Sequence, residues 1–125
     1  GESAILSKTS ASYKLWLNGG WLKVAFNGST IPSSDSGVSV STNTWTHVAV
    51  TSDGTYVKFY KNGCIVSTVT ESQGAVSSTS NITIGTDHGS LGFPGKVDNL
   101  KIYNYARSAS QIYDEDYGQS SGGCG

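Results

Sequence analysis

Residues 43–69, NTWTHVAVTSDGTYVKFYKNGCIVSTV, predict three antiparallel strands joined by two tight turns. Asp53-Gly54 and Asn62-Gly63 are dipeptides that favour two-residue hairpin turns. A turn at each dipeptide pairs Val48 with Phe59 and Phe59 with Val66. The resulting apolar face consists of Val48, Val50, Val57, Phe59 and Val66. The opposite face is mixed and rich in aromatic residues, so we expect it not to be fully solvated.

A second hairpin is predicted over residues 13–28, YKLWLNGGWLKVAFNG. A turn at Gly19-Gly20 gives six cross-strand pairs, from Asn18/Trp21 to Tyr13/Phe26. One face then collects Tyr13, Leu15, Leu17, Leu22, Val24 and Phe26. The other collects Lys14, Trp16, Asn18, Trp21, Lys23 and Ala25. This segregation is typical of a sheet with one buried side.

The composition agrees with an all-β domain. The 125 residues suffice for one domain, with 16 Gly and only 14% charged residues. The net charge is −1 and the lysines are scattered, which argues against nucleic-acid binding. No apolar stretch reaches the length of a membrane span.

The C-terminal half predicts a short strand at NITIGTD, a glycine-rich connection, and a last strand at KVDNLKIYNYA (residues 96–106). Ser108 and Gln111 fit a capping box for one helical turn. We therefore place a β-sandwich over residues 1–113 and an acidic, Gly/Ser-rich flexible tail over residues 114–125. Seven or eight strands and almost no helix indicate an all-β, two-sheet antiparallel sandwich.

These motifs together resemble the laminin G-like domains of the concanavalin A-like lectin/glucanase superfamily. The resemblance covers roughly residues 3–113 and rests on a Trp-x-His-Val-Ala strand, two Gly turns and a closing Gly-Lys-Val-Asp strand. The matching residues are Trp45, His47, Val48, Ala49, Asp53, Gly54, Tyr60, Asn62, Gly63, Gly95, Lys96, Val97, Asp98, Ala106, Arg107 and Ser108. It implies a jelly-roll fold and an extracellular or cell- or virion-surface location.

One departure from the family concerns the N-terminus. Relatives usually begin with one or two further strands before the segment that here starts at Ile5-Leu6. We expect their absence to leave an open sheet edge, where a partner chain or a second copy could add a strand.

Three groups of residues are candidate contacts for a ligand. Trp16 and Trp21 are expected as exposed diagonal neighbours that either stack on a sugar ring or are covered by protein. The outer face of the central meander offers His47, paired with Tyr60, together with Tyr56 and Lys58; a purely structural role is the alternative. Asp87 and His88 lie in a polar Gly-rich loop, a common place for binding sites.

The resemblance implies one further site, for a metal ion. In relatives that bind calcium, an aspartate at the position of Asp98 is a ligand, so structural calcium is an optional cofactor here. The alternative is that Asp98 caps loop amides.

No catalytic constellation is evident. Glycoside hydrolysis needs two carboxylates placed around the scissile bond, and no strand supplies them. Nor does the sequence contain a nucleophile elbow, a phosphate loop or a His cluster. We therefore expect a protein that is not an enzyme.

Two functions remain. The first is a recognition module that binds a glycan or an extracellular protein. The second is a structural or decoration subunit of an extracellular or viral assembly, completed by a partner strand. Cys64 and Cys124 would form either an intrachain or an intermolecular disulfide.

Overall fold

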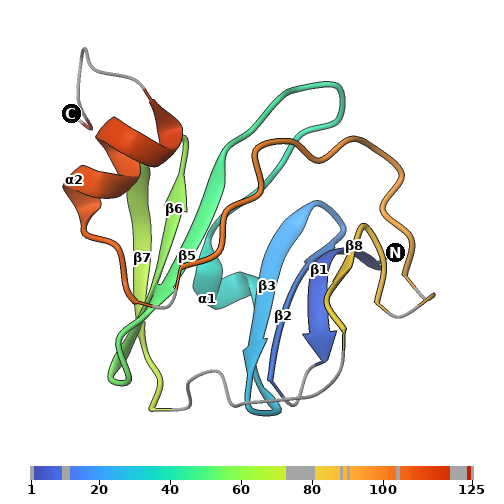
Figure 1. Cartoon of the computed structure of the whole chain (residues 1–125), viewed down its shortest axis with the longest axis horizontal. Coiled ribbons are helices and arrows are strands. Elements are labelled where there is room, and N and C mark those ends of the chain that lie inside the picture. Colours follow the sequence, from blue (N-terminus) through green and yellow to red (C-terminus); the bar gives the residue numbers. More distant parts are fainter. Residues whose placement is uncertain are drawn as a thin grey trace.

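Two antiparallel sheets face each other across a common core in the computed structural model (Figure 1). The structure describes residues 2–9, 12–72, 81–87, 89, 91–103, 105–118 and 124. The five-stranded sheet has the order β4-β3-β2-β1-β8, and the three-stranded sheet has the order β5-β6-β7. The predicted all-β sandwich of two antiparallel sheets is confirmed. No helix among the described residues is both long and apolar enough to cross a membrane.

The strands of the described residues divide between the two sheets. The first sheet contains β1 (Glu2–Thr9), β2 (Tyr13–Asn18), β3 (Trp21–Phe26), β4 (Ser29–Ile31) and β8 (Thr83–Ile84). The second contains β5 (Val48–Ser52), β6 (Tyr56–Lys61) and β7 (Cys64–Thr70). The helical elements are α1 (Ser33–Ser36), α2 (Ala109–Gln111) and the π-helix η1 (Ile112–Tyr117).

The β2–β3 hairpin has the predicted register in full. All six pairs, from Asn18/Trp21 to Tyr13/Phe26, are present. Gly19 and Gly20 both have positive φ, as a primed two-residue turn requires. The hairpin therefore directs its predicted apolar face into the core.

The first turn of the central meander lies one residue later than predicted. Ser52 pairs with Val57 and Ala49 with Tyr60, so Gly54 and Thr55 form the two-residue loop. The Asp53 carboxylate accepts hydrogen bonds from the amides of Thr55 and Tyr56 and so stabilises this position. The predicted His47/Tyr60 pair is therefore wrong.

A bulge follows the second turn. Lys61 pairs with Cys64 as predicted, but the register shifts between Phe59 and Tyr60, and Phe59 pairs with Ser67 rather than Val66. The extra residue turns the Val66 side chain away from the core, and Val66 is exposed. Val66 was wrongly assigned to the apolar face.

The core joins both sheets. Its buried members are Ile5, Leu6, Leu17, Leu22, Val24, Ile31, Val38, Val57 and Phe59. Helix α1 ties the sheets together at one end: the buried hydroxyl of Ser36 donates to the Leu22 carbonyl, and the Ser67 hydroxyl donates to the Ser36 carbonyl. This end of the sandwich is closed by polar contacts as well as by apolar packing.

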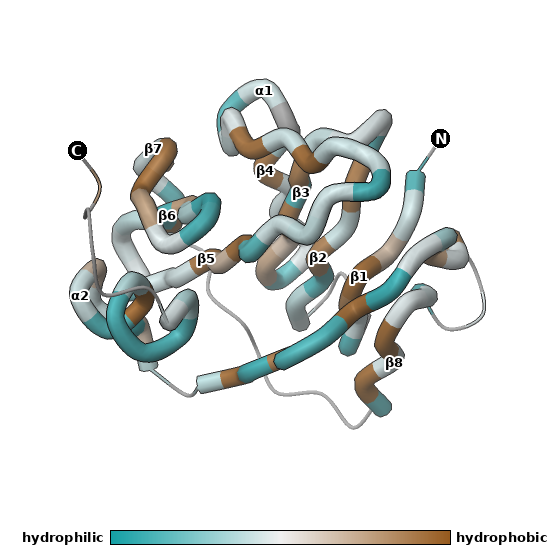
Figure 2. The backbone as a smooth tube through the Cα atoms, turned by 90° about the horizontal axis from the view of Figure 1, so that it is seen from above, coloured by the Kyte–Doolittle hydropathy of each residue, from teal (hydrophilic) through white to brown (hydrophobic). Residues whose placement is uncertain are grey.

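The predicted last strand is absent from the described part of residues 96–106. This segment runs from the side of β8 to α2 as an isolated extended stretch in both views (Figures 1 and 2). Asn99 adopts a left-handed φ of 52°, and its amide donates to the Asp98 carboxylate. This local bend interrupts a regular strand.

The C-terminal residues also differ from expectation. The capping box of Ser108 and Gln111 is present, as predicted. The helical segment then continues through η1, so residues 114–117 belong to a folded element and not to a flexible tail. The assignment of these acidic residues to a solvated tail was wrong because Asp116 finds a cationic partner, described below.

The bulge gives a test with two identical substitutions. Val57→Ala should lower the free energy of unfolding by about 2 kcal/mol, since two methylene equivalents leave a fully buried site. Val66→Ala, at an exposed position of the neighbouring strand, should change it by less than about 0.5 kcal/mol. Urea denaturation measures both, and equal losses would contradict the bulged register.

Candidate functional site

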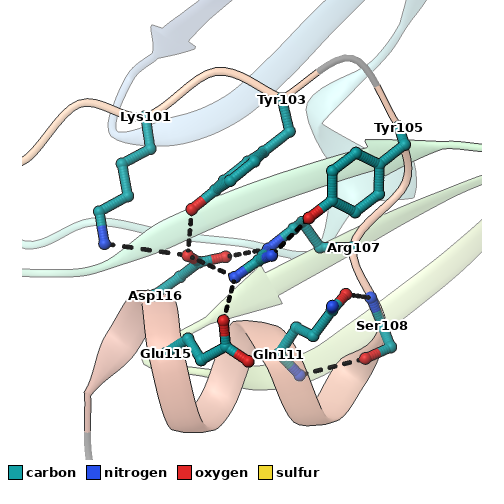
Figure 3. Close-up of polar contacts among 8 residues, drawn as sticks. All are labelled: Lys101, Tyr103, Tyr105, Arg107, Ser108, Gln111, Glu115 and Asp116. Atoms are coloured by element: carbon teal, nitrogen blue, oxygen red, sulfur yellow. Dashed lines mark hydrogen bonds and ion pairs between the residues drawn. The ribbon is translucent and has the colours of Figure 1, made fainter.

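A polar cluster joins the extended segment to the C-terminal helix (Figure 3). Arg107 donates through Nε and Nη2 to the two carboxylate oxygens of Asp116, each at 3.2 Å, and through Nη2 to Glu115 at 3.0 Å. Tyr103 donates its hydroxyl to Asp116 at 2.7 Å, and Lys101 lies 3.9 Å from the same carboxylate. Three side chains therefore contact the Asp116 carboxylate, and the Asp116 side chain is only 8% exposed.

The electrostatics of the cluster favour the charged forms. Burial opposes ionisation of Asp116, but hydrogen bonds from Arg107 and Tyr103 outweigh it and lower the pKa of Asp116. The hydrogen bond to Asp116 raises the pKa of Tyr103. Arg107 also lies over the Tyr103 ring, 4.2 Å from its centroid. The Asp116 carboxylate thus holds the side chains of Tyr103 and Arg107 in place.

The helical segment docks on the three-stranded sheet beside the Asn62-Gly63 turn. A Cβ at Gly63 would lie 2.7 Å from Tyr117 and 2.8 Å from Tyr113, so glycine permits this close approach. The ring of Tyr117 lies 5.7 Å from that of His47. A disulfide between Cys64 and Cys124 secures the same end of the sheet, which resolves the two cysteine alternatives in favour of the intrachain bond.

This docking changes the predicted ligand face of the meander. Tyr60 is 2% exposed and cannot contact a ligand, and His47 is half-buried beside Tyr117. Tyr56 remains exposed and Lys58 half-buried. This agrees with the expectation that the face is not fully solvated and favours the structural alternative for His47 and Tyr60, because the chain's own C-terminal segment packs against that end of the sheet.

Trp16 is also buried, which corresponds to the predicted alternative that protein covers it: Leu91, from a loop of the same chain, packs against its cluster. Trp16 lies on the outer face of the five-stranded sheet, as the alternation required, but it is only 5% exposed. Lys14 and Lys23 lie over its ring at 4.3 and 5.0 Å, and its Nε1 donates to Glu2 at 3.0 Å. These side chains occupy the surface that a sugar would need, whereas Trp21 is 46% exposed.

Asp87 belongs to the same face. It forms an ion pair with Lys14 at 3.0 Å and accepts a hydrogen bond from Ser7 at 2.8 Å. The structure thus connects Asp87 with Trp16 through Lys14, which sequence order did not indicate. His88 lies outside the described residues.

Asp98 is exposed, and its carboxylate accepts from the Asn99 amide, which fits the loop-capping alternative. Among the described residues, no three His, Cys, Asp or Glu side chains gather closely enough to hold a metal ion. The described residues therefore give no support for a calcium site around Asp98, and calcium stays a prediction from the sequence.

An unpaired apolar stretch is the feature that the sequence analysis missed. Between Lys96 and Tyr103, four large side chains are 37% to 53% exposed: Val97, Leu100, Ile102 and Tyr103. No backbone–backbone hydrogen bond joins residues 94–103 to the rest of the described chain. The alternation predicted a paired strand with a buried face. The apolar side chains are present, but no strand of the described residues pairs with this segment.

The comparisons with known proteins agree with this fold. A laminin G family model, described as the concanavalin A-like lectin/glucanases superfamily, matches residues 1–113, and the chain belongs to this superfamily. A crystal structure of an S-layer domain-containing protein from Clostridium thermocellum (residues 221–444) is similar, with 27% identity and a TM-score of 0.51. The match covers 90% of this chain and 62% of that one. A search of curated proteins found no match.

The two carboxylates that bind Arg107 give a matched pair of variants. Asp116→Asn should lower the free energy of unfolding by about 1–3 kcal/mol, because it weakens several charge-assisted hydrogen bonds. Glu115→Gln should cost less than about 0.5 kcal/mol, since Glu115 is 62% exposed. Chemical denaturation at pH 7 measures both.

The pH dependence provides the control. Because the pKa of folded Asp116 is lowered, its contribution is present above the unfolded-state pKa and is lost as pH falls through the folded-state pKa. The difference between wild type and Asp116→Asn should therefore shrink in acid. A difference that stays constant down to pH 2 would contradict the ion pair.

Proposed function

We propose that this domain is a non-catalytic cell-surface module that joins polypeptides. In this proposal, an extended segment of a partner polypeptide pairs with residues 96–103 and covers their apolar side chains. The observation that carries the proposal is the coincidence of exposed apolar side chains and unpaired backbone along one extended stretch.

Strand addition suits this stretch physically. Backbone amides and carbonyls of the partner would supply affinity, and alternate side chains would supply specificity. Contiguous apolar exposure on one segment marks an interaction surface more strongly than scattered residues do. Leu100 and Ile102 lie two residues apart, so a straightened strand would present both on one face.

The neighbouring structure supports a surface location. That structure belongs to an S-layer domain-containing protein, and the present chain spans 62% of its length. A structural or adhesive role at a cell surface is the corresponding proposal here. The carboxylates of Glu2, Asp87 and Asp116 are all committed to ion pairs, which is consistent with a protein that is not an enzyme.

Carbohydrate binding is the second candidate function. Two exposed aromatic side chains favour it: Trp21 on β3 is 46% exposed and Tyr56 on β6 is 44% exposed. Either ring could stack its face on a pyranose. Trp16 and Tyr60 are not part of this proposal, because both are buried. Loss of glycan-array binding in a folded Trp21→Ala variant would favour this function over the first.

Site-specific photocrosslinking tests the first function. Ile102→p-benzoylphenylalanine, in the protein at its native cell surface, should crosslink to polypeptide. Ile65→p-benzoylphenylalanine, similarly exposed but on β7, should not. Adding Leu100→Lys should abolish the crosslink at position 102, because a charge is then placed in the contact.

The chemical identity of the crosslinked product decides between the two functions. Protease-sensitive adducts from position 102 alone support strand addition. Adducts from both positions in equal yield, none at all, or adducts removed only by glycosidase would overturn it.

A further inference from the structure

His47 lies immediately before β5. Its backbone is fixed, since His47 N donates to the Asn62 side chain at 3.0 Å and Asn62 N donates to the His47 carbonyl at 2.8 Å. Its ring packs against Tyr117. The Nδ1 atom is buried and has no hydrogen-bond partner among the described residues. The ring is thus held between the sheet and the C-terminal helix.

The neutral form of this ring suits the site better than the charged form. An unprotonated Nδ1 is only an unmet acceptor, whereas a protonated one would be a buried cationic donor without an acceptor. The charged groups facing His47 oppose each other: Asp116 on η1 favours the imidazolium, and Lys101 on the extended segment disfavours it. Burial is the largest effect and lowers the pKa of His47.

Relief of a buried charge at His47 would require Tyr117 to move. The packing offers little room for a local adjustment, because Gly63 already lies against both Tyr113 and Tyr117. Ile112 at the other end of η1 is buried, so both ends of this short helix are packed against the rest of the domain. Displacement of Tyr117 therefore means displacement of η1 from the sheet.

We propose that the C-terminal helical segment is an acid-sensitive latch controlled by His47. When the imidazole gains its second proton, Tyr117 and η1 leave the three-stranded sheet and water reaches Nδ1. The Cys64–Cys124 disulfide keeps the released segment attached, so the latch closes again when the proton is lost. The latch needs no ligand at residues 96–103, because His47 and η1 alone carry it.

The direction of the pH effect follows from linkage. The pKa of His47 is lower in the latched state than the ordinary value of 6.5, so the released state binds more protons. The latched state is fully stable above the ordinary pKa, and its stability is lost as pH falls through the latched-state pKa. Within this window, the ratio of released to latched protein rises about tenfold per pH unit.

Hydrogen exchange of the intact, disulfide-bonded chain measures the latch directly. Protection of the η1 amides, corrected for the intrinsic pH dependence of exchange, should fall about tenfold per pH unit below pH 6.5 and then level off. The core amides of β6 should keep their protection over the same range. Simultaneous loss in β6 would mean global unfolding and would overturn the proposal.

Two single substitutions provide the controls. His47→Gln cannot titrate, so its η1 protection should not depend on pH above about pH 5, where Asp116 stays ionised; a fall identical to that of wild type in this range would overturn the proposal. His88→Gln leaves His47 as the one histidine and should behave like wild type. If His47→Gln does not fold, the imidazole titration of the His88→Gln protein by NMR decides: a His47 pKa at or above 6.5 would overturn the latch.

Discussion

Among the described residues, backbone hydrogen bonding to the sheets ends at Phe93, whose amide donates to the Gly85 carbonyl. Between there and Ser108, the described chain is held by side chains and not by a sheet ladder. An antiparallel sheet ladder repeats its hydrogen bonds at every second residue pair, whereas here a few polar side chains hold the segment. This constraint shapes the whole C-terminal third of the molecule.

Asp116 is the group at which these contacts converge. It fixes Tyr103 and Arg107 on the extended segment, while Tyr117, the next residue, packs against His47. The helix and the extended segment are therefore mechanically connected through adjacent residues. A change at His47 would reach the apolar surface between Lys96 and Tyr103 without any change in the core. Surface availability and latch position are thus coupled in this account.

The N-terminal hairpin could be predicted fully because its information is local. Gly19 and Gly20 specify the turn, and period-two alternation then assigns each side chain to a face. In the central meander, the same logic gave the strands but not their register. Hydrogen bonds to the Asp53 side chain place the first hairpin turn one residue later than predicted. The bulge that turns Val66 outward has no local sequence signal.

Exposure was harder to predict than orientation. Trp16 lies on the predicted face, but Glu2, Lys14 and Lys23 cover it, and these come from three strands. Tyr60 is likewise on the expected face and buried. Asp116 was missed as a structural residue because its acidic, glycine-rich surroundings are typical of a tail. Each of these outcomes depends on tertiary contacts that single-strand patterns do not contain.

The central claim is that residues 96–103 are an unpaired, apolar acceptor for another polypeptide. Amide hydrogen exchange of the isolated chain at pH 7 tests its physical basis most directly. The account predicts that the amides from Leu100 to Tyr103 exchange near their intrinsic rates, while those of Val57 and Phe59 in β6 are strongly protected. Protection from Leu100 to Tyr103 equal to that in β6 would show that this segment is already paired, and would contradict the account.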